Sequence, residues 1–195
     1  AAENLRRHTE IVTQALDLMI LVSDDSTLTL DPELDTYYLM DAVVVRMPLL
    51  LEKMALARGA GTGIIAKQSI SDQQKVFISQ LMSELQSNLD AMNSGMDKVS
   101  RFAPAAGARL KEFNERFPAE TAGVSKLVRD QILEQRFEIP SQDYFARTTA
   151  VIDQGYKAVF DVPVHVSAVL GKTAMEVSDL LKLGRGTIVE LDRKV

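Results

Sequence analysis

An apolar stripe between residues 78 and 99 sets the fold class of this chain. Its seven members are spaced by 3, 4, 4, 3, 4 and 3 residues: Ile78, Leu81, Leu85, Leu89, Met92, Met96 and Val99. This spacing is typical of a long α-helix that packs against other helices over most of its length. It predicts a helical bundle rather than a sheet protein.

Two helices are expected before this stripe. Residues 3–23 carry one apolar face at helical spacing, formed by Leu5, Val12, Leu16 and Met19. A second helix is expected from about 32 to 58, with Asp31 as its cap and a kink near Pro48, where an interior N–H is missing. The glycines of GAGTG, residues 59–63, predict a loosened turn there.

The remaining breaks complete the bundle. Ser71 and Gln74 have the spacing of a capping box, which predicts the start of the long helix. Pro104 and Gly107 predict its end, and further helices are expected at about 105–116, 119–136 and 141–160, with Pro118 near one boundary. We therefore expect residues 1–160 to form a mainly α domain, an antiparallel four-helix bundle.

The hydrophobic period changes after Asp161. Val162, Val164 and Val166 alternate with other residues, which predicts a strand. A short helix and a second short strand are expected to follow, so residues 161–195 are predicted to be a β-α-β appendage. A segment of this size buries too little apolar surface to fold alone. It is therefore expected to pack on the bundle, to pair with a second copy or to begin a larger domain.

The composition excludes several kinds of protein. The net charge is −5, which argues against nucleic acid as the main partner. The absence of cysteine excludes disulfides and thiol catalysis. No apolar stretch is long enough to span a bilayer and no signal peptide is apparent. If the native protein is anchored in a membrane, the anchors are expected in segments absent from this sequence.

Catalytic signatures are not found. The two histidines, His8 and His165, lie far apart in the sequence, and neither has metal ligands at a conventional spacing. The stretch VLGKT at 169–173 resembles the end of a phosphate-binding loop, but Val166 stands where that motif needs glycine. We expect a protein that is not an enzyme, with no cofactor and no metal.

Five residues of the second helix are candidates for binding a small molecule. They are Tyr37, Tyr38, Asp41, Arg46 and Arg58. A half-buried arginine can hold a carboxylate or a similar anion through its planar set of donors, and tyrosine offers an apolar wall with a polar tip. The alternative is that Arg46 and Arg58 pair with acidic side chains of neighbouring helices.

The stretches DTYYLMDAVVVRMPLLLEKMALARGAG and DYFARTTAVIDQGYKAVFD resemble the extracytoplasmic sensor region of bacterial methyl-accepting chemotaxis receptors, over residues 1–160. The resemblance implies a periplasmic four-helix bundle in an inner-membrane protein, a dimer that binds a small ligand between helices. Our first hypothesis is therefore a ligand-sensing domain of a chemotaxis receptor.

The C-terminal stretch VPVHVSAVLGKTAMEVSDLLKLGRGTIVELDRKV, within residues 159–195, is similar to the start of the C-terminal domain of the flagellar motor switch protein FliN. This resemblance implies contacts with other flagellar switch proteins at the cytoplasmic face of the motor. The alternative hypothesis is therefore a motor switch component, with residues 161–195 as a partial switch segment joined to the helices by a natural or constructed fusion.

Overall fold

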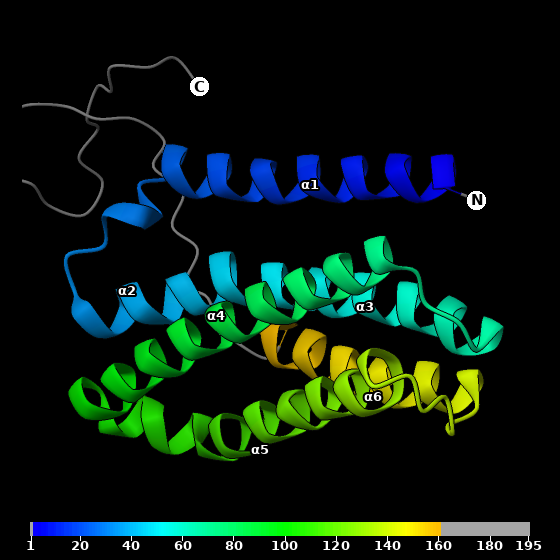
Figure 1. Ribbon diagram of the computed structural model, residues 1–195. Coiled ribbons are helices and arrows are strands. Elements are labelled where there is room, and N and C mark those ends of the chain that lie inside the picture. The colour runs from blue at the N-terminus through cyan, green and yellow to red at the C-terminus, as the bar shows by residue number, and fades with distance from the viewer. Residues whose placement is uncertain (1, 161–195) are drawn as a thin grey trace, which may run out of the picture. The chain divides into compact units, whose positions relative to one another are not determined.

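The computed structural model describes residues 2–160, and the chain divides into two units between Asp161 and Val162. The described part consists of helices connected by short turns (Figure 1). Its elements are α1 (Ala2–Asp25), η1 (Leu28–Leu30), α2 (Leu34–Met40), η2 (Asp41–Arg46), α3 (Met47–Lys67), α4 (Asp72–Phe102), α5 (Pro104–Val128), η3 (Arg129–Leu133) and α6 (Ser141–Phe160). Here η1 is a 3₁₀-helix, and η2 and η3 are π-helices.

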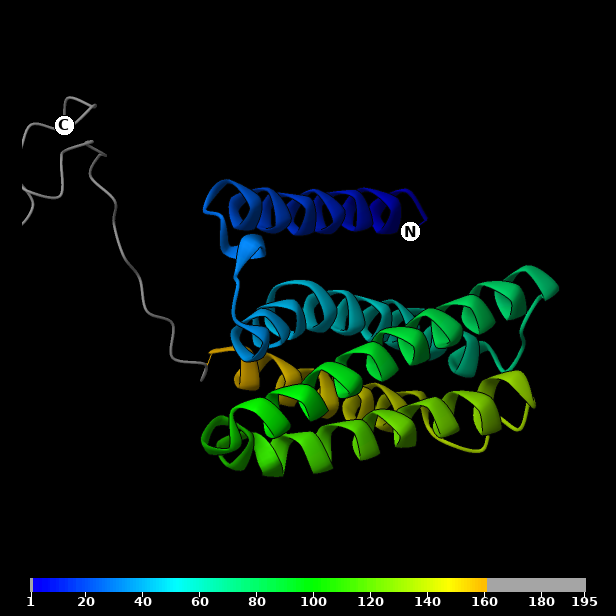
Figure 2. The ribbon, with the colours of Figure 1, turned by 90° about the vertical axis from the view of Figure 1, so that its left-hand side faces the viewer.

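Four helical rods form the bundle. The first consists of α2, η2 and α3 in one continuous run, and the others are α4, α5 with η3, and α6. The α3 helix packs against both α4 and α6, and α5 also packs against both, so the four rods close into a ring. Successive rods run in opposite directions (Figures 1 and 2). This arrangement agrees with the predicted antiparallel bundle.

The apolar core runs along the inside of this ring. All seven residues of the stripe between 78 and 99 are buried, as predicted. They meet fully buried side chains from the other three rods, including Leu50, Met54, Phe117, Val128, Ile132 and Tyr144. Burial of side chains of this size is the main source of the bundle's stability.

The predicted capping box is confirmed at the start of α4. The Ser71 side chain accepts a hydrogen bond from the backbone N–H of Gln74, and the Gln74 side chain accepts one from the backbone N–H of Ser71. At the other end of α4, Ala103 is the only residue between α4 and α5. A Cβ atom on Gly107 would lie 2.6 Å from Cα of Ser100, so this tight reversal requires glycine.

A π-helix lies just before Pro48, where a kink was expected. The π-helix η2 ends two residues before Pro48, and the backbone N–H of Met47 bonds to the carbonyl of Ala42, five residues earlier. Proline lacks an N–H and crowds the carbonyl four residues before it. The wider π turn accommodates this defect without ending the helix.

Two expected breaks are continuous helix instead. The α3 helix runs through GAGTG to Lys67, and α5 runs through Pro118 to Val128. Gly61 is buried beneath the ring of Tyr144 and the side chain of Ile132, where no Cβ atom would fit. The glycine therefore serves close helix packing rather than a turn.

The first helix lies outside the ring. In both views α1 lies beside the α2–α3 rod, antiparallel to it and away from α5 and α6 (Figures 1 and 2). Val12, Leu16 and Ile20 are half-buried on the side of α1 that faces the bundle. The bundle is therefore made by residues 34–160, and α1 is an additional helix.

The predicted fold class needs a correction. Residues 2–160 are helical and contain no strand, and the β-α-β appendage is not seen. That appendage was expected at 161–195, which lies outside the described residues. A strand needs a partner for its backbone N–H and C=O groups, and the elements within residues 2–160 include no strand that could provide one. The fold that the structure supports is an α-helical bundle with one additional helix.

Candidate functional site

Arg58 is held between α3 and α6. Its Nη1 donates a hydrogen bond to Oγ1 of Thr149 at 2.9 Å, and its guanidinium lies 4.7 Å from the centroid of the Phe145 ring. Thr149 and Phe145 are four residues apart, so they share one face of α6. The Arg58 guanidinium therefore makes a hydrogen bond and a cation–π contact with side chains of the protein.

Tyr144, on the same helix, is fully buried against α3. Its hydroxyl donates a hydrogen bond to the carbonyl oxygen of Ala57 at 2.9 Å. Burial disfavours the charged phenolate and raises the pKa of Tyr144 well above its usual value. Tyr144 was not among the predicted site residues, although it lies in the stretch DYFARTTAVIDQGYKAVFD.

Tyr38 contacts α4. Lys98 Nζ donates a hydrogen bond to the Tyr38 hydroxyl at 2.6 Å and lies 4.2 Å from the centroid of its ring. The ring packs over Gly95, where a Cβ atom would lie 3.2 Å from Cδ1 of Tyr38. Tyr37 is more exposed and touches Tyr38 edge to face, with 5.3 Å between the ring centroids.

Asp41 and Arg46 pair with each other. Arg46 Nε donates to Oδ2 of Asp41 at 3.1 Å. The two residues are the first and last of the π-helix η2, whose wide turn brings residues five apart to the same side. The alternative prediction was that Arg46 pairs with an acidic side chain of a neighbouring helix. Arg46 does have an acidic partner, but this partner lies on the same rod.

The five predicted site residues form three separate groups. Tyr37 with Tyr38, Asp41 with Arg46, and Arg58 each have contacts of their own. Arg58 lies twelve positions after Arg46 on the same rod, which is about 18 Å along a helix. A shared ligand site for all five residues stays a prediction, and the internal contacts give each group a structural role.

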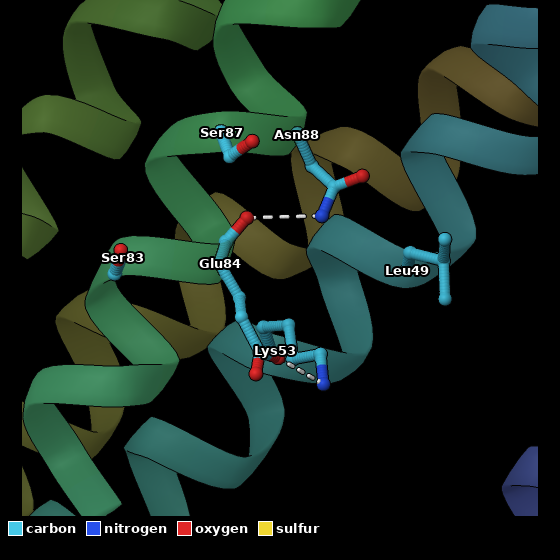
Figure 3. A pocket seen from close by; sticks show the side chains of 6 residues that line it. All are labelled: Leu49, Lys53, Ser83, Glu84, Ser87 and Asn88. Atoms are coloured by element: carbon cyan, nitrogen blue, oxygen red, sulfur yellow. Dashed lines mark hydrogen bonds and ion pairs between the residues drawn. The ribbon is translucent and has the colours of Figure 1, made fainter. Parts of the chain in front are cut away.

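A shallow groove of about 510 Å³ lies between α3 and α4 (Figure 3). Leu49 and Lys53 line it from α3, and Ser83, Glu84, Ser87 and Asn88 line it from α4. Lys53 Nζ lies 2.5 Å from Oε2 of Glu84, and Asn88 Nδ2 donates to the backbone carbonyl of Glu84 at 2.9 Å. None of these residues was predicted.

The ion pair of the groove sets its electrostatics. The hydrogen bond from Lys53, and a second from Gln80, lower the pKa of Glu84 below its usual value. The neighbouring Glu52 is half-buried, and burial raises its pKa. The pKa values of the two carboxyl groups are therefore shifted in opposite directions. The Glu84 carboxylate already accepts hydrogen bonds from Lys53 and Gln80.

Two kinds of feature are absent from the part of the chain that the structure describes. No helix between residues 2 and 160 is long and apolar enough to cross a membrane. No group of three or more His, Cys, Asp or Glu side chains within that range could hold a metal ion.

Comparison with known proteins finds a similarity in the C-terminal part of the chain. Residues 157–195 match the family described as type III flagellar switch regulator (C-ring) FliN, C-terminal part. The flagellar motor switch protein FliN of Caulobacter vibrioides is 68% identical over 37 residues, which are 19% of this chain and 34% of that relative. The chain thus spans about a third of the length of this relative. No solved structure matches the chain.

These comparisons support one of the two resemblances. The similarity to FliN is found at the predicted place, and the sensor region of chemotaxis receptors is not found. The findings therefore favour the motor switch hypothesis over the ligand-sensing hypothesis. The FliN-like match begins at Lys157, inside the last turn of α6, and so overlaps the end of the bundle.

Proposed function

We propose that this protein is a non-enzymatic component of a flagellar motor switch, located at the cytoplasmic face of the motor. Residues 157–195 would contact other flagellar switch proteins, and the helical bundle would hold that segment. The observation that carries this proposal is the 68% identity with a FliN over 37 residues. Such identity over a whole segment reflects many side chains, not a short motif.

The junction between bundle and segment supports this division of roles. The match begins at Lys157 while α6 continues to Phe160, so the two share residues 157–160. The last turns of α6 are anchored by Gly155, which packs closely under Leu51 of α3 and Phe117 of α5. The first four residues of the match, 157–160, are therefore part of a helix that packs in the bundle.

The polar groups of the bundle also favour a structural role for it. Arg58 bonds to Thr149, Lys98 to Tyr38 and Lys53 to Glu84, in each case within the protein. A ligand that used these groups would have to displace internal partners, and the loss of those bonds would oppose binding. A sensor role for residues 1–160, with a small ligand and a periplasmic location, has no support from the comparisons.

The proposal is tested by binding to purified flagellar switch proteins. Three chains are compared: the complete chain, a chain that ends at Phe160, and a chain in which residues 162–195 are present in scrambled order. The scrambled chain is the matched control, because it keeps the length and composition of the segment. We expect only the complete chain to bind.

Helix content measured by circular dichroism shows whether the bundle is intact in all three chains. Equal binding by the scrambled chain would contradict the proposal, and so would an absence of binding by the complete chain.

A thermal-shift screen separates this proposal from the sensor hypothesis. A ligand at a hundredfold excess over its Kd would stabilise a sensor by about 2.7 kcal/mol. We expect no shift of Tm with amino acids, organic acids or purines. A reproducible shift that is lost in Arg58→Met, together with no binding to switch proteins, would favour the sensor.

A further inference from the structure

A second apolar face on α1 is not covered by the bundle. Ile11, Leu18 and Val22 are 66%, 58% and 57% exposed. With Ala15, which is also exposed, they are spaced by 4, 3 and 4 residues, the spacing of a coiled-coil seam. We refer to Ile11, Ala15, Leu18 and Val22 as the outer stripe.

The outer stripe is distinct from the face that packs on the bundle. The half-buried residues Val12, Leu16 and Ile20 define the inner face of α1. At 3.6 residues per turn, the centres of the two faces are about 130° apart around the helix. A partner can therefore contact the outer stripe without displacing α1 from α2 and α3, and both views show no described helix on the far side of α1 (Figures 1 and 2).

We propose that the outer stripe pairs with the same stripe of a second copy of this chain, with the two α1 helices antiparallel. The stripe is self-complementary in this register. When two copies cross between positions 16 and 17, Ile11 meets the partner's Val22 and Ala15 meets the partner's Leu18. Each layer then joins one larger and one smaller or branched side chain, as close packing of helices requires.

The charges of α1 select the antiparallel direction. Its first turns carry Arg6 and Arg7, and its last turn carries Asp24 and Asp25. In the antiparallel register, the next layer outward from Ile11 and Val22 places His8 opposite the partner's Asp25. Arg7 is next to His8 in the sequence and lies beside the same aspartate. A parallel pair would instead place arginines beside arginines and aspartates beside aspartates. Charge complementarity therefore favours the antiparallel pair, and the antiparallel helix dipoles add to it.

A second copy fits this face better than an unrelated partner. The same helix in antiparallel orientation matches the outer stripe both in the register of its apolar residues and in its charges. The inference does not depend on the role of residues 157–195 in a motor switch. Its tests use the complete chain and compare variants of α1 with the unchanged chain.

The first test measures self-association by sedimentation across a concentration series. We expect Leu18→Glu to weaken the dimer at least tenfold in Kd, since it places a carboxylate in the central layer. Val76→Glu is the matched control, because Val76 is an apolar residue of α4 outside the outer stripe, 68% exposed against 58% for Leu18. Equal Kd values for Leu18→Glu and the unchanged chain would overturn the proposal.

The second test reads the direction of the pair. The chain has no cysteine, so a single introduced cysteine is a unique site for a short bismaleimide cross-linker. In the antiparallel pair the two copies of residue 15 are about 4.5 Å apart along the axis, and the two copies of residue 8 about 25 Å. We expect Ala15→Cys to cross-link and His8→Cys not to. Cross-linking of both would show a parallel pair, and cross-linking of neither would exclude the contact; either outcome overturns the proposal.

A charge exchange gives a third, independent result. Arg7→Asp and Asp25→Arg are each expected to weaken the dimer, and the two together to restore it. Within one chain these residues are about 27 Å apart along the helix, too far to interact directly. Restoration by the double variant therefore reports a contact between two copies. If the double variant lost as much dimer affinity as the two single variants together, this result would count against the antiparallel pair.

Discussion

The hydroxyl of Tyr144 donates a hydrogen bond to the carbonyl oxygen of Ala57 at 2.9 Å, although the two residues are 87 positions apart. This bond links the first turn of α6 to the middle of α3. Gly61, one turn further along α3, leaves the space that the tyrosine ring fills. The contact between α3 and α6 therefore depends on a glycine in one helix and an aromatic side chain in the other.

Gly61→Ala is expected to destabilise the protein by about 1–3 kcal/mol, because the new methyl group would collide with Tyr144 and Ile132. Gly63→Ala is the matched control, since a Cβ atom there meets nothing within 4 Å. Alanine is the better helix former, so this control should gain up to about 1 kcal/mol. Urea unfolding measures both. Equal changes for the two variants would show that the predicted collision does not occur.

Thr149→Val is expected to cost about 1 kcal/mol. The substitution keeps the shape of the side chain but removes the acceptor of the hydrogen bond from Arg58. Arg58 Nε already lacks a partner in the described structure, so the loss leaves this guanidinium poorly satisfied. Thr13→Val on the exposed side of α1 serves as the control, with an expected change within 0.5 kcal/mol, a typical range for surface positions. Thermal unfolding followed by circular dichroism distinguishes them.

Tyr38→Phe and Tyr37→Phe form a pair of variants at neighbouring positions. Only Tyr38 accepts a hydrogen bond from Lys98. We expect Tyr38→Phe to lower the free energy of unfolding by about 0.5–1 kcal/mol and Tyr37→Phe to have a smaller effect. Lys98→Met, which also removes the cation from the Tyr38 ring, should cost more than Tyr38→Phe. The opposite order would show that the lysine is not engaged with the ring.

The half-buried Glu52 is expected to make the stability of the protein depend on pH. Burial raises its pKa in the folded protein above the usual value of 4.5. A carboxyl group of this kind binds its proton more tightly in the folded state, so stability falls as pH rises from 4.5 through the raised pKa. Glu52→Gln should therefore raise Tm slightly at pH 7, by about 1–2 °C.

The same variant should leave Tm nearly unchanged at pH 3, well below 4.5, where the carboxyl group is protonated in both states. Thermal scans at the two pH values measure the effect. A Tm lowered by the substitution at pH 7 would contradict the assignment, because it would mean that the charged carboxylate stabilises the fold.

The features that could be predicted from the sequence are local ones. The Ser71–Gln74 capping box involves neighbouring residues, and the apolar stripe of α4 is a repeat within one helix. Both are visible in the sequence because their spacing alone determines them. The bundle class follows from such patterns.

The features that were missed depend on residues far away in the sequence. Gly61 was expected to loosen α3, but it is helical because Tyr144 of α6 packs on it. Lys98 is 60 positions from Tyr38, and Thr149 is 91 positions from Arg58. No spacing rule connects such pairs, so sequence reasoning found the tyrosine and the arginine but not their partners.

The overlap between α6 and the FliN-like match has a consequence for where the chain can be divided. Since the similarity begins at Lys157 and the helix ends at Phe160, residues 157–160 belong to both. Gly155 and Tyr144 fix the two ends of α6 against α3. A cut before Lys157 would therefore remove the last turn of a helix that packs in the bundle, and a cut after Phe160 would leave part of the matched sequence behind.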